Sequence, residues 1–575
     1  MSDESKTIQR TQHAFLVAWG WFAEEIGLIQ KIQEAALKQK TYTHSPKSKV
    51  LEFLVGTLAG MQHLQELSLS AHPLDCDQAV AEAWGQLGWA DYSGVSRTMS
   101  AQGWAEAHAI VAVLEEVSRP YLQAELQRLR SSGQRLRIDA DLTGLPVSNT
   151  SRTYPNAAFG HMDDEVRLGY QAGVVSLAGP IYGRMWLSAM HHSGDTISST
   201  QAEGLMLEAE RRLGERPKRR TELLKKRIEA LEPHLKKIQE RLNAQEQALP
   251  RAQERLEETR QQIQSQQVQL EDLEQDYQLR RREERPTGQL AKARQRSQIL
   301  ARRLKFREAA RLSADKRLAK TQKHWEEALA EQASLQERLK RFEQDNASNP
   351  DPVEAECRLD AGFGSYQNVA LLIEMGYEIY TKSPSQQLTN FLRRQIDASA
   401  SYTRVGANAE MLAWPKKLLS PCPYPLDIAL ERFYTGSTLK HATLLHYGND
   451  PVTQDLPQWF HHYNGRQTIE AGIKEGKQVF YLHKIKVRSE PAIYLQECCV
   501  LFAANFIRWA SHWLAEQTQP GKHALDVSKL GIKRQVQVAA HVSAQVIRNS
   551  EGRLLRFSSH SAFAGKVLQL PGGPP

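Results

Sequence analysis

The chain has 575 residues, with 74 lysines and arginines against 66 aspartates and glutamates, and a formal net charge of +8. This length is too great for a single hydrophobic core and predicts three or four domains, while the mildly basic balance favours an anionic partner. Five cysteines without a C-x-x-C pair argue against a disulfide framework and a cysteine zinc site. The amino terminus has no signal-peptide pattern and the longest apolar run stops at Arg508, so we expect a cytoplasmic protein without a membrane partner.

Residues 1–130 read as a helical DNA-binding domain. Within residues 76–102, a helix-like run meets a glycine-containing break, and a second short helix follows with Ser93 as its N-cap. This pattern resembles a helix-turn-helix and would place Arg97, as a DNA-binding residue, near the start of a recognition helix. An ordinary helical hairpin is the alternative interpretation.

Residues 131–215 are predicted to form the first part of an α/β core. The run R-L-R-I-D-A-D-L-T-G-L-P, from Arg135, reads as a strand ending in a loop that presents Asp139 or Asp141. Strand-like runs at 166–177 and 181–191 follow after short turns, so the three strands are expected to form an antiparallel meander. A helix begins in the segment that follows them.

Residues 216–345 have the alternating four- and three-residue spacing of apolar positions that is typical of a coiled coil, broken once at 284–288. The two arms match in length, which predicts an antiparallel hairpin roughly 85–90 Å long. Pro233 and Pro250 predict kinks in the outgoing arm. The returning arm carries twelve lysines and arginines and two acids between Lys292 and Lys323, a bias that favours contact with DNA over a solvated face of mixed charge.

The core is expected to resume at residues 346–383, where V-E-A-E-C-R-L-D-A-G-F-G-S reads as a buried strand ending in Asp360. A helix and a second strand follow, which indicates a parallel βαβ unit. Residues 384–455 read as a small β-rich insertion, residues 456–520 as the third core part, and residues 521–575 as C-terminal strands and a tail.

The third core part contains the stretch Y-N-G-R-Q-T-I-E-A-G-I-K-E-G-K, residues 463–477. On one continuous helix, Tyr463, Arg466, Glu470 and Lys477 would share a stripe about 60° wide, bordered by Lys474. A carboxylate among phosphate-binding groups suits a protein that holds a metal ion against a nucleic-acid backbone. A solvated charged face with a Glu470–Lys474 ion pair is the alternative.

Three carboxylates thus stand on separate elements of one α/β core: Asp141 or Asp139, then Asp360 and Glu470. Hard oxygen ligands select Mg²⁺ or Mn²⁺. Two such ions can activate the nucleophile and stabilise the leaving oxygen of a phosphodiester. Glu475 lies about 140° around the helix from Glu470 and is not expected to replace it.

These residues resemble the DDE transposases with an RNase H-like core, and in particular bacterial insertion-sequence enzymes with the signature Y-x2-R-x3-E-x6-K. D-L-T-G-L-P at 141–146 resembles the first-aspartate block of that group, and R-L-D-A-G-F-G-S at 358–365 resembles the second. The resemblance covers residues 135–200 and 353–560. It implies that Asp141, Asp360 and Glu470 are catalytic and hold two Mg²⁺ or Mn²⁺ ions, with Asp139 in reserve because Thr143 fits the motif after Asp141.

The resemblance also implies contacts with DNA. Tyr463, Arg466 and Lys477 would hold phosphates near the cleaved end, with Lys474 beside them. A tryptophan in or near the β insertion would stack on a flipped base; Trp414 and Trp459 are the candidates, with core packing as the favoured interpretation of each.

The long hairpin departs from the family. Asp141 and Asp360 are 219 positions apart, and removing the hairpin restores the spacing of a compact core. The fold expected is therefore an α/β RNase H-like core with a helical N-terminal domain, an antiparallel coiled-coil hairpin insertion and a small β insertion. The hairpin would clamp DNA, bridge two subunits of a synaptic complex or dock another protein.

The expected function is cut-and-paste DNA transposition by a nucleoid-associated bacterial enzyme, a homodimer on double-stranded DNA. Metal-activated water would nick each transposon end, and the freed 3′-hydroxyl would attack the other strand or the target; the resemblance implies hairpin intermediates. One alternative is a catalytically silent, transposase-derived DNA-binding protein. Another is a structural coiled-coil protein that organises DNA, although the sequence lacks the phosphate loop that such ATPases need.

Overall fold

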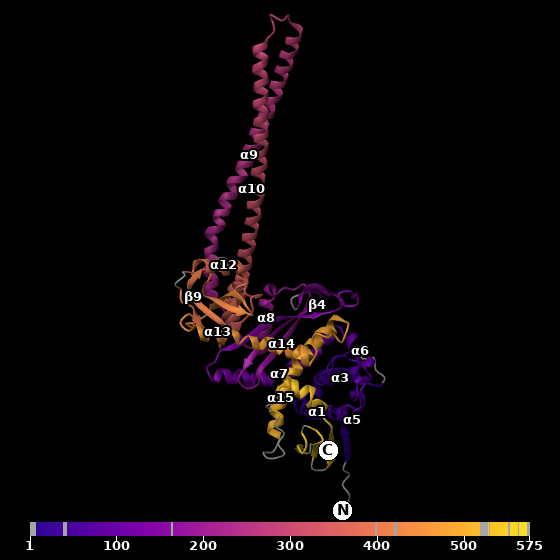
Figure 1. Ribbon diagram of the computed structural model, residues 1–575. Helices are drawn as coiled ribbons and strands as arrows, with labels where there is room; N and C mark the ends of the chain where they lie inside the picture. The colour runs from indigo at the N-terminus through magenta and orange to yellow at the C-terminus, as the bar shows by residue number, and fades with distance from the viewer. Residues whose placement is uncertain are drawn as a thin grey trace, which may run out of the picture. The chain divides into compact units, whose positions relative to one another are not determined.

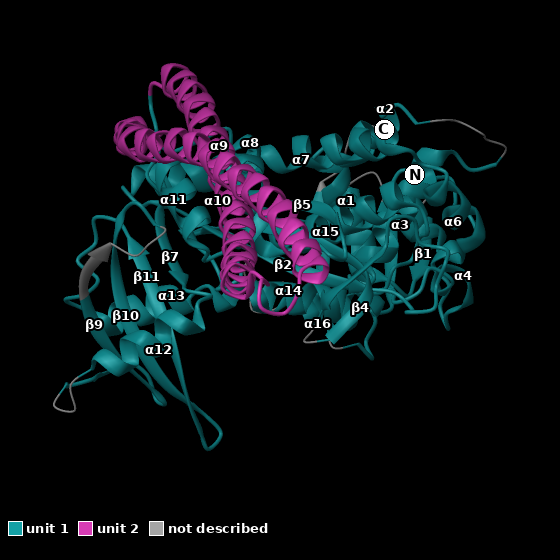
Figure 2. Cartoon of the chain, turned by 90° about the horizontal axis from the view of Figure 1, so that it is seen from above, with its two compact units in different colours: residues 1–218, 351–575 teal, residues 219–350 magenta. Residues whose placement is uncertain are grey.

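The computed structural model describes residues 7–37, 43–162, 165–396, 400–418, 422–517, 527, 530–549, 552–561 and 563–571. The fold is mixed α/β, and the chain divides into two compact units (Figure 2). Unit 1 comprises residues 1–218 and 351–575, and unit 2 comprises residues 219–350. None of the helices among the described residues is both long and apolar enough to traverse a bilayer.

The amino-terminal part of unit 1 is helical. Its helices are α1 (Ala14–Glu25), α2 (Leu28–Glu34), α3 (Pro46–Leu58), α4 (Glu66–Leu69), η1 (Leu74–Cys76), α5 (Gln78–Ala83), α6 (Tyr92–Ser100) and α7 (Trp104–Ser131). The N-cap of α6 is Asp91, whose carboxylate accepts from the backbone N–H of Gly94, so the prediction of Ser93 as the cap is wrong.

The segment predicted as a helix-turn-helix has a different geometry. Eight residues connect α5 to α6, whereas the turn of that motif has about three or four. Trp84 and Trp89 are buried in this connection, which explains its length, because both indoles have to reach the core. Arg97 is exposed but lies in the last turn of α6, not near the start of a recognition helix.

The two ends of the chain meet in a four-stranded antiparallel sheet. Its strands, in spatial order, are β1 (Thr7–Thr11), β12 (Ala544–Asn549), β13 (Gly552–Phe557) and β14 (Val567–Pro571). The helices α16 (Ile532–Gln537) and η3 (Ala539–His541) precede β12. Residues 521–575 thus contain the expected strands, and two short helical segments come before them.

The central sheet of unit 1 has ten strands. They are β2 (Leu136–Pro146), β3 (Ala158–Met162), β4 (Glu165–Gly179), β5 (Gly183–Ser193), β6 (Ala355–Arg358), β7 (Glu378–Lys382), β8 (Thr403–Arg404), β9 (Ala409–Leu418), β10 (Pro425–Thr435) and β11 (Thr438–Tyr447). Its centre runs β5-β4-β2-β6-β7, with antiparallel pairing from β5 to β2 and parallel pairing from β2 to β7. The meander and the parallel unit were both predicted, whereas β3 was not.

The β-rich insertion continues this sheet and does not form one of its own. β11 pairs with β7, and β10, β9 and β8 follow in antiparallel order. The helix α12 (Gln386–Gln395) precedes these strands, within a segment that was predicted to be β-rich throughout. The insertion therefore shares the core of the central sheet.

Helices cover the central sheet. They are η2 (Ser198–Thr200), α8 (Ala202–Leu213), α11 (Tyr366–Glu374), α13 (Leu456–Asn464), α14 (Gln467–Val479) and α15 (Glu490–Gln517). α8 packs on β4 and β5, and α15 packs on β5 and α7. α14 approaches the sheet closely at Gly472, where a Cβ atom would lie 2.7 Å from the Trp186 ring.

Unit 2 is a pair of long helices, α9 (Thr221–Leu279) and α10 (Thr287–Ala347), which run side by side (Figure 1). Ion pairs join positions that descend along α9 as they ascend along α10, such as Lys225 with Glu343 and Glu274 with Arg294. This register shows an antiparallel hairpin, as predicted. α9 remains one helix through Pro233 and Pro250.

The two ends of the hairpin are held together by hydrogen bonds. The backbone N–H of Arg219 donates to Asn346 Oδ1 at 2.8 Å, and Asn346 Nδ2 donates back to the Arg219 carbonyl at 3.0 Å. Within unit 1, Pro217 forms a parallel bridge with Val353. The chain thus leaves and rejoins unit 1 at neighbouring positions.

Because these positions are neighbours, replacing residues 220–345 by a glycine-serine linker of about four residues should leave unit 1 folded. Circular dichroism and thermal unfolding of the shortened protein should show one cooperative transition with β-sheet signal retained. Aggregation or the loss of that transition would show that the core needs the hairpin.

Candidate functional site

Two aspartates lie at the carboxyl ends of neighbouring parallel strands. β2 pairs with β6 only from Leu136 to Asp139, although β2 itself continues to Pro146. Asp141 therefore lies beyond the last parallel pair, and Asp360 follows the end of β6 by two residues. Because the carboxyl ends of parallel strands meet at one edge of a sheet, both carboxyl groups face the same region.

The stretch predicted as one helix from Tyr463 to Lys477 is two helices, so that prediction is wrong at residues 465 and 466. The backbone N–H of Arg466 donates to the Tyr463 carbonyl at 3.0 Å, three residues back instead of four. The His462 carbonyl accepts from Arg358 Nη1 at 3.0 Å instead. Gly465 permits this approach, because a Cβ atom there would lie 2.5 Å from that nitrogen. The tightened turn separates α13 from α14, and α14 then packs against β2.

Arg466 links the carboxylates that come from these two elements. Its Nη1 lies 3.5 Å from Asp141 Oδ2, and its Nη2 pairs with the Glu470 carboxylate one turn along α14. The Arg466 side chain is largely buried. The structure therefore brings together Asp141, Asp360, Arg466 and Glu470, all of which the sequence singled out.

The site holds more negative charge than Arg466 neutralises. Burial raises the pKa of Asp141 to about 7, and the neighbouring charges of Asp360 and Glu470 add to the effect while Arg466 opposes it. Burial also raises the pKa of Asp360 above its usual range, again against Arg466. Clustered, partly protonated carboxylates are relieved by a divalent cation, and oxygen donors of this kind fit Mg²⁺ or Mn²⁺.

A cleft of about 800 Å³ opens from these carboxylates. Asp141 and Glu470 line it together with Lys474 and Lys477, and residues 159–162 and 194–199 also contribute to the lining. Glu470 and Lys474 are exposed, and Lys477 is half-buried. Two cations thus lie along the same cleft as the carboxylates, as phosphate binding requires.

The geometry distinguishes Asp139 from Asp141, which alternation along a strand leaves open. Asp139 is fully buried, and both of its carboxylate oxygens accept from arginines: Arg358 Nε and Nη2 at 2.7 Å and Arg184 Nη2 at 2.8 Å. Arg184 also donates to the Thr468 hydroxyl on α14. Asp139 is therefore shielded from the cleft and already faces two guanidinium groups, and it joins the strands to the helix of Glu470, so the reserve assignment is withdrawn.

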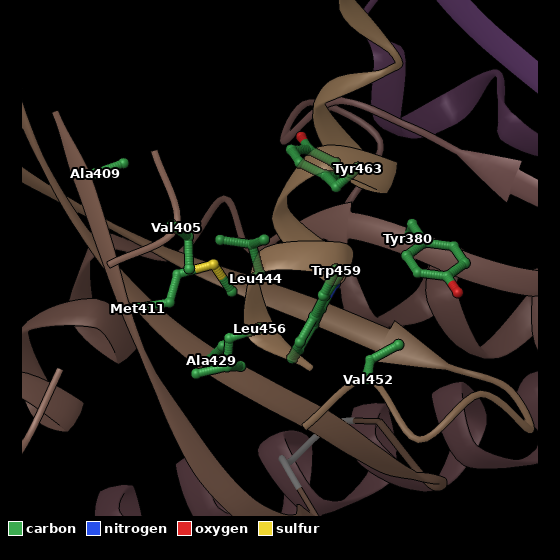
Figure 3. Close-up of a cluster of buried hydrophobic side chains, with 10 residues drawn as sticks. All are labelled: Tyr380, Val405, Ala409, Met411, Ala429, Leu444, Val452, Leu456, Trp459 and Tyr463. Carbon is green, nitrogen blue, oxygen red and sulfur yellow. The ribbon is translucent and has the colours of Figure 1, made fainter. Parts of the chain in front are cut away.

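Tyr463 and Trp459 belong to a buried apolar cluster that α13 forms with the strands of the insertion (Figure 3). Trp459 is 1% exposed, so its stacking on a flipped base is wrong and the core-packing interpretation is confirmed. Tyr463 is 4% exposed and donates its hydroxyl to the Leu359 carbonyl at 3.4 Å. In this structure Tyr463 does not present a surface to phosphate; it holds the residue before Asp360.

Trp414 has a different environment. It lies in β9, half-buried, and lines a pocket of about 490 Å³ with Asp427 and Asp450. None of the residues that line this pocket also lines the cleft of Asp141 and Glu470. Base stacking by Trp414 stays a prediction.

Apart from the residues of the cleft, the ligating atoms of Glu378, His446 and Asp450 lie within 4.8 Å of one another, a cluster that the sequence did not predict. Its two carboxylates already share an arginine. Arg135 Nη1 lies 2.8 Å from Glu378 and 2.7 Å from Asp450. The pKa of Asp450 lies below its usual range because Arg135 and Tyr380 donate to it against the cost of burial. The guanidinium thus fills the place of a cation in this cluster.

Comparison with known proteins adds no assignment: no protein-family model matches the chain, and no curated protein matches it in sequence.

Sequence reasoning missed Arg184 and Arg358. Arg358 lies in the R-L-D-A-G-F-G-S block, so its position two residues before Asp360 was the available signal. Arg184 carried no such signal, since its partner lies on another strand.

Asp139→Ala should destabilise unit 1, because the change leaves the buried guanidinium groups of Arg184 and Arg358 without a counter-charge. Breaking a buried ion pair in this way costs about 3–5 kcal/mol of unfolding free energy. Urea denaturation would measure it. Asp141→Asn is the matched control and should not lower the unfolding free energy; equal losses in both variants would contradict the assignment.

Asp141→Asn should change how stability depends on pH. The folded pKa of about 7 lies above the ordinary value of 3.8, so the folded state binds the extra proton and loses stability as pH rises between them. In EDTA, the variant should therefore have a higher Tm than the wild type at pH 8 and no such advantage near pH 4. Mg²⁺ at pH 8 should raise the Tm of the wild type more than that of the variant. Parallel pH profiles would contradict this placement of Asp141.

Proposed function

We propose that this chain is a DDE transposase, a Mg²⁺-dependent endonuclease and polynucleotidyl transferase built on an RNase H-like core. The centre of the main sheet, with three antiparallel strands followed by two parallel strands, supports that core. The helical pair falls between the first and second aspartates, as an insertion that leaves the sheet continuous.

One observation carries the proposal. Asp141 from β2, Asp360 from the loop after β6 and Glu470 from α14 form one electrostatic cluster at a cleft that also contains Lys474 and Lys477. Carboxylates from three separate elements can reach metal ions from different sides. Cations along the same cleft can hold a phosphodiester in front of them.

In this proposal Asp141, Asp360 and Glu470 hold two divalent ions. Bound there, such ions would activate a water or a 3′-hydroxyl for attack and stabilise the leaving oxygen. Arg466 balances the charge of Asp141 and Glu470 and stands next to the scissile phosphate. Lys474 and Lys477 orient the DNA backbone, and Tyr463 fixes the loop of Asp360 through the Leu359 carbonyl.

The substrate would be double-stranded DNA at the ends of a mobile element, cut and then joined to a target, with hairpin intermediates. A homodimer that holds both ends would carry out the reaction in the bacterial cytoplasm. A chain that binds such ends without cutting them would instead be the silent derivative.

Asp360→Asn should abolish cleavage of a duplex that carries the inverted repeats flanking the gene, in Mg²⁺, and leave binding of that duplex unchanged. The carboxylate supplies metal binding and makes no other charged contact that binding needs. Gel-based cleavage and fluorescence anisotropy would measure the two properties.

The two glutamates of α14 provide a matched pair of controls. Glu470→Gln should also abolish cleavage, whereas Glu475→Gln should retain it, because Glu475 faces Arg508 at 3.1 Å and not the cleft. Cleavage by Asp360→Asn or by Glu470→Gln at the wild-type rate would overturn the proposed function. Binding without cleavage by the wild type would identify the silent derivative.

A further inference from the structure

The basic residues of α10 gather on one face of the helix. With Leu300 and Leu304 in the seam against α9, a period of about 3.5 residues per turn places eight of them within an arc of about 100°. These residues, here called the basic stripe, are Lys292, Arg296, Arg302, Arg303, Lys316, Arg317, Lys320 and Lys323, and all eight are exposed. The stripe is therefore a cationic surface in two patches, at residues 292–303 and 316–323, and not an evenly mixed helix face.

The acidic residues in this part of α10 lie on its other edge. Its two acids between residues 292 and 323 are Glu308 and Asp315, which occupy equivalent positions in the seven-residue repeat. On that edge the helices exchange ion pairs: Arg294 with Glu274 at 2.9 Å, and Glu308 with Arg260 at 3.8 Å. Charge there is largely neutralised across the helix pair.

The edge of α9 that borders the basic stripe does not neutralise it. The residues at the matching positions of the α9 repeat, between 248 and 269, are Ala248, Arg255, Gln262 and Gln269. At the two ends of the stripe an acid occupies or approaches it: Asp276 has the same α9 position, and Glu327 lies 3.8 Å from Lys323. Residues of both helices therefore produce the difference in charge between the two edges of the hairpin.

We propose that the basic stripe binds the phosphate backbone of double-stranded DNA without reading its sequence; this inference rests on the proposed function. From Lys292 to Lys323 the stripe is about 46 Å long at 1.5 Å per residue. One turn of DNA spans about 34–36 Å. The stripe thus follows the duplex for more than one turn, beyond the reach of a contact at the cleaved phosphate alone.

The same surface fits a lipid bilayer or another helix less well. Ile299, Phe306 and Leu312 are exposed within or beside the stripe, but three separate apolar side chains do not make the wide apolar face that an interfacial helix buries. The apolar seam of α10, including Leu300, Leu335 and Phe342, is already buried in unit 2. Dispersed cations without an apolar stripe are what a phosphate backbone requires.

The test compares full-length variants with equal loss of charge. Arg296→Gln, Arg303→Gln and Arg317→Gln together remove three stripe cations, while Lys226→Gln, Lys236→Gln and Arg260→Gln remove three exposed cations of α9 away from the edge that borders the stripe, as the control. The probe is a labelled 40-base-pair duplex of random sequence, measured by anisotropy from 50 to 300 mM NaCl. A second stripe triple, at Lys292, Lys320 and Lys323, repeats the test independently if the first triple misfolds.

The stripe triple should bind roughly 10- to 100-fold more weakly at 0.15 M salt, and the slope of log K against log salt should shrink by about 2 to 3. The control triple should keep the slope of the wild type. A wild-type slope in both stripe triples overturns this inference alone, while cleavage at transposon ends would still support the proposed function. A wild type that binds no DNA overturns both. Stripe-dependent binding to phosphatidylserine vesicles, with DNA binding unaffected, would assign the stripe to lipid and also overturn it.

Discussion

The buried ion cluster of Asp139, Arg184 and Arg358 is the interaction on which the candidate site depends. One aspartate on β2 accepts from arginines on β5 and β6. The same arginines reach the Thr468 hydroxyl and the His462 carbonyl at the junction of α13 and α14. Three strands and two helices therefore meet through these side chains, and the Asp139 carboxylate at their centre is fully buried. Glu470, two residues after Thr468, receives its position from this network.

The charges at the neighbouring cleft are balanced differently. In the buried cluster two guanidinium groups face one carboxylate, whereas at the cleft the single guanidinium of Arg466 faces three carboxylates. The first arrangement is stable without any ligand, whereas the second leaves the pKa of Asp141 near neutrality. The same residue types thus form two clusters, one of them structural and the other with a deficit of positive charge. That deficit makes the cluster at the cleft the one suited to cations and phosphate.

The helical hairpin shows how an insertion can be large and still leave a sheet intact. Its ends are joined by hydrogen bonds between Arg219 and Asn346, so the chain leaves and re-enters unit 1 at positions as close as the two ends of a short turn. The β-rich insertion follows the opposite principle, since β11 adds directly to β7 and extends the central sheet. One insertion is structurally separate, and the other shares its core with unit 1.

The sequence by itself determined the elements whose signals are local: the long helical pair from its seven-residue repeat, the strands around Asp141 and Asp360, and the residues Arg466 and Glu470 one helical turn apart. Only the tertiary structure decided between Asp139 and Asp141, because alternation places both on one face and the arginines that occupy Asp139 come from other strands. It also decided the break at Gly465, which follows from the approach of Arg358, and the burial of Tyr463 and Trp459. Contacts between distant segments set these outcomes, and no local pattern records them.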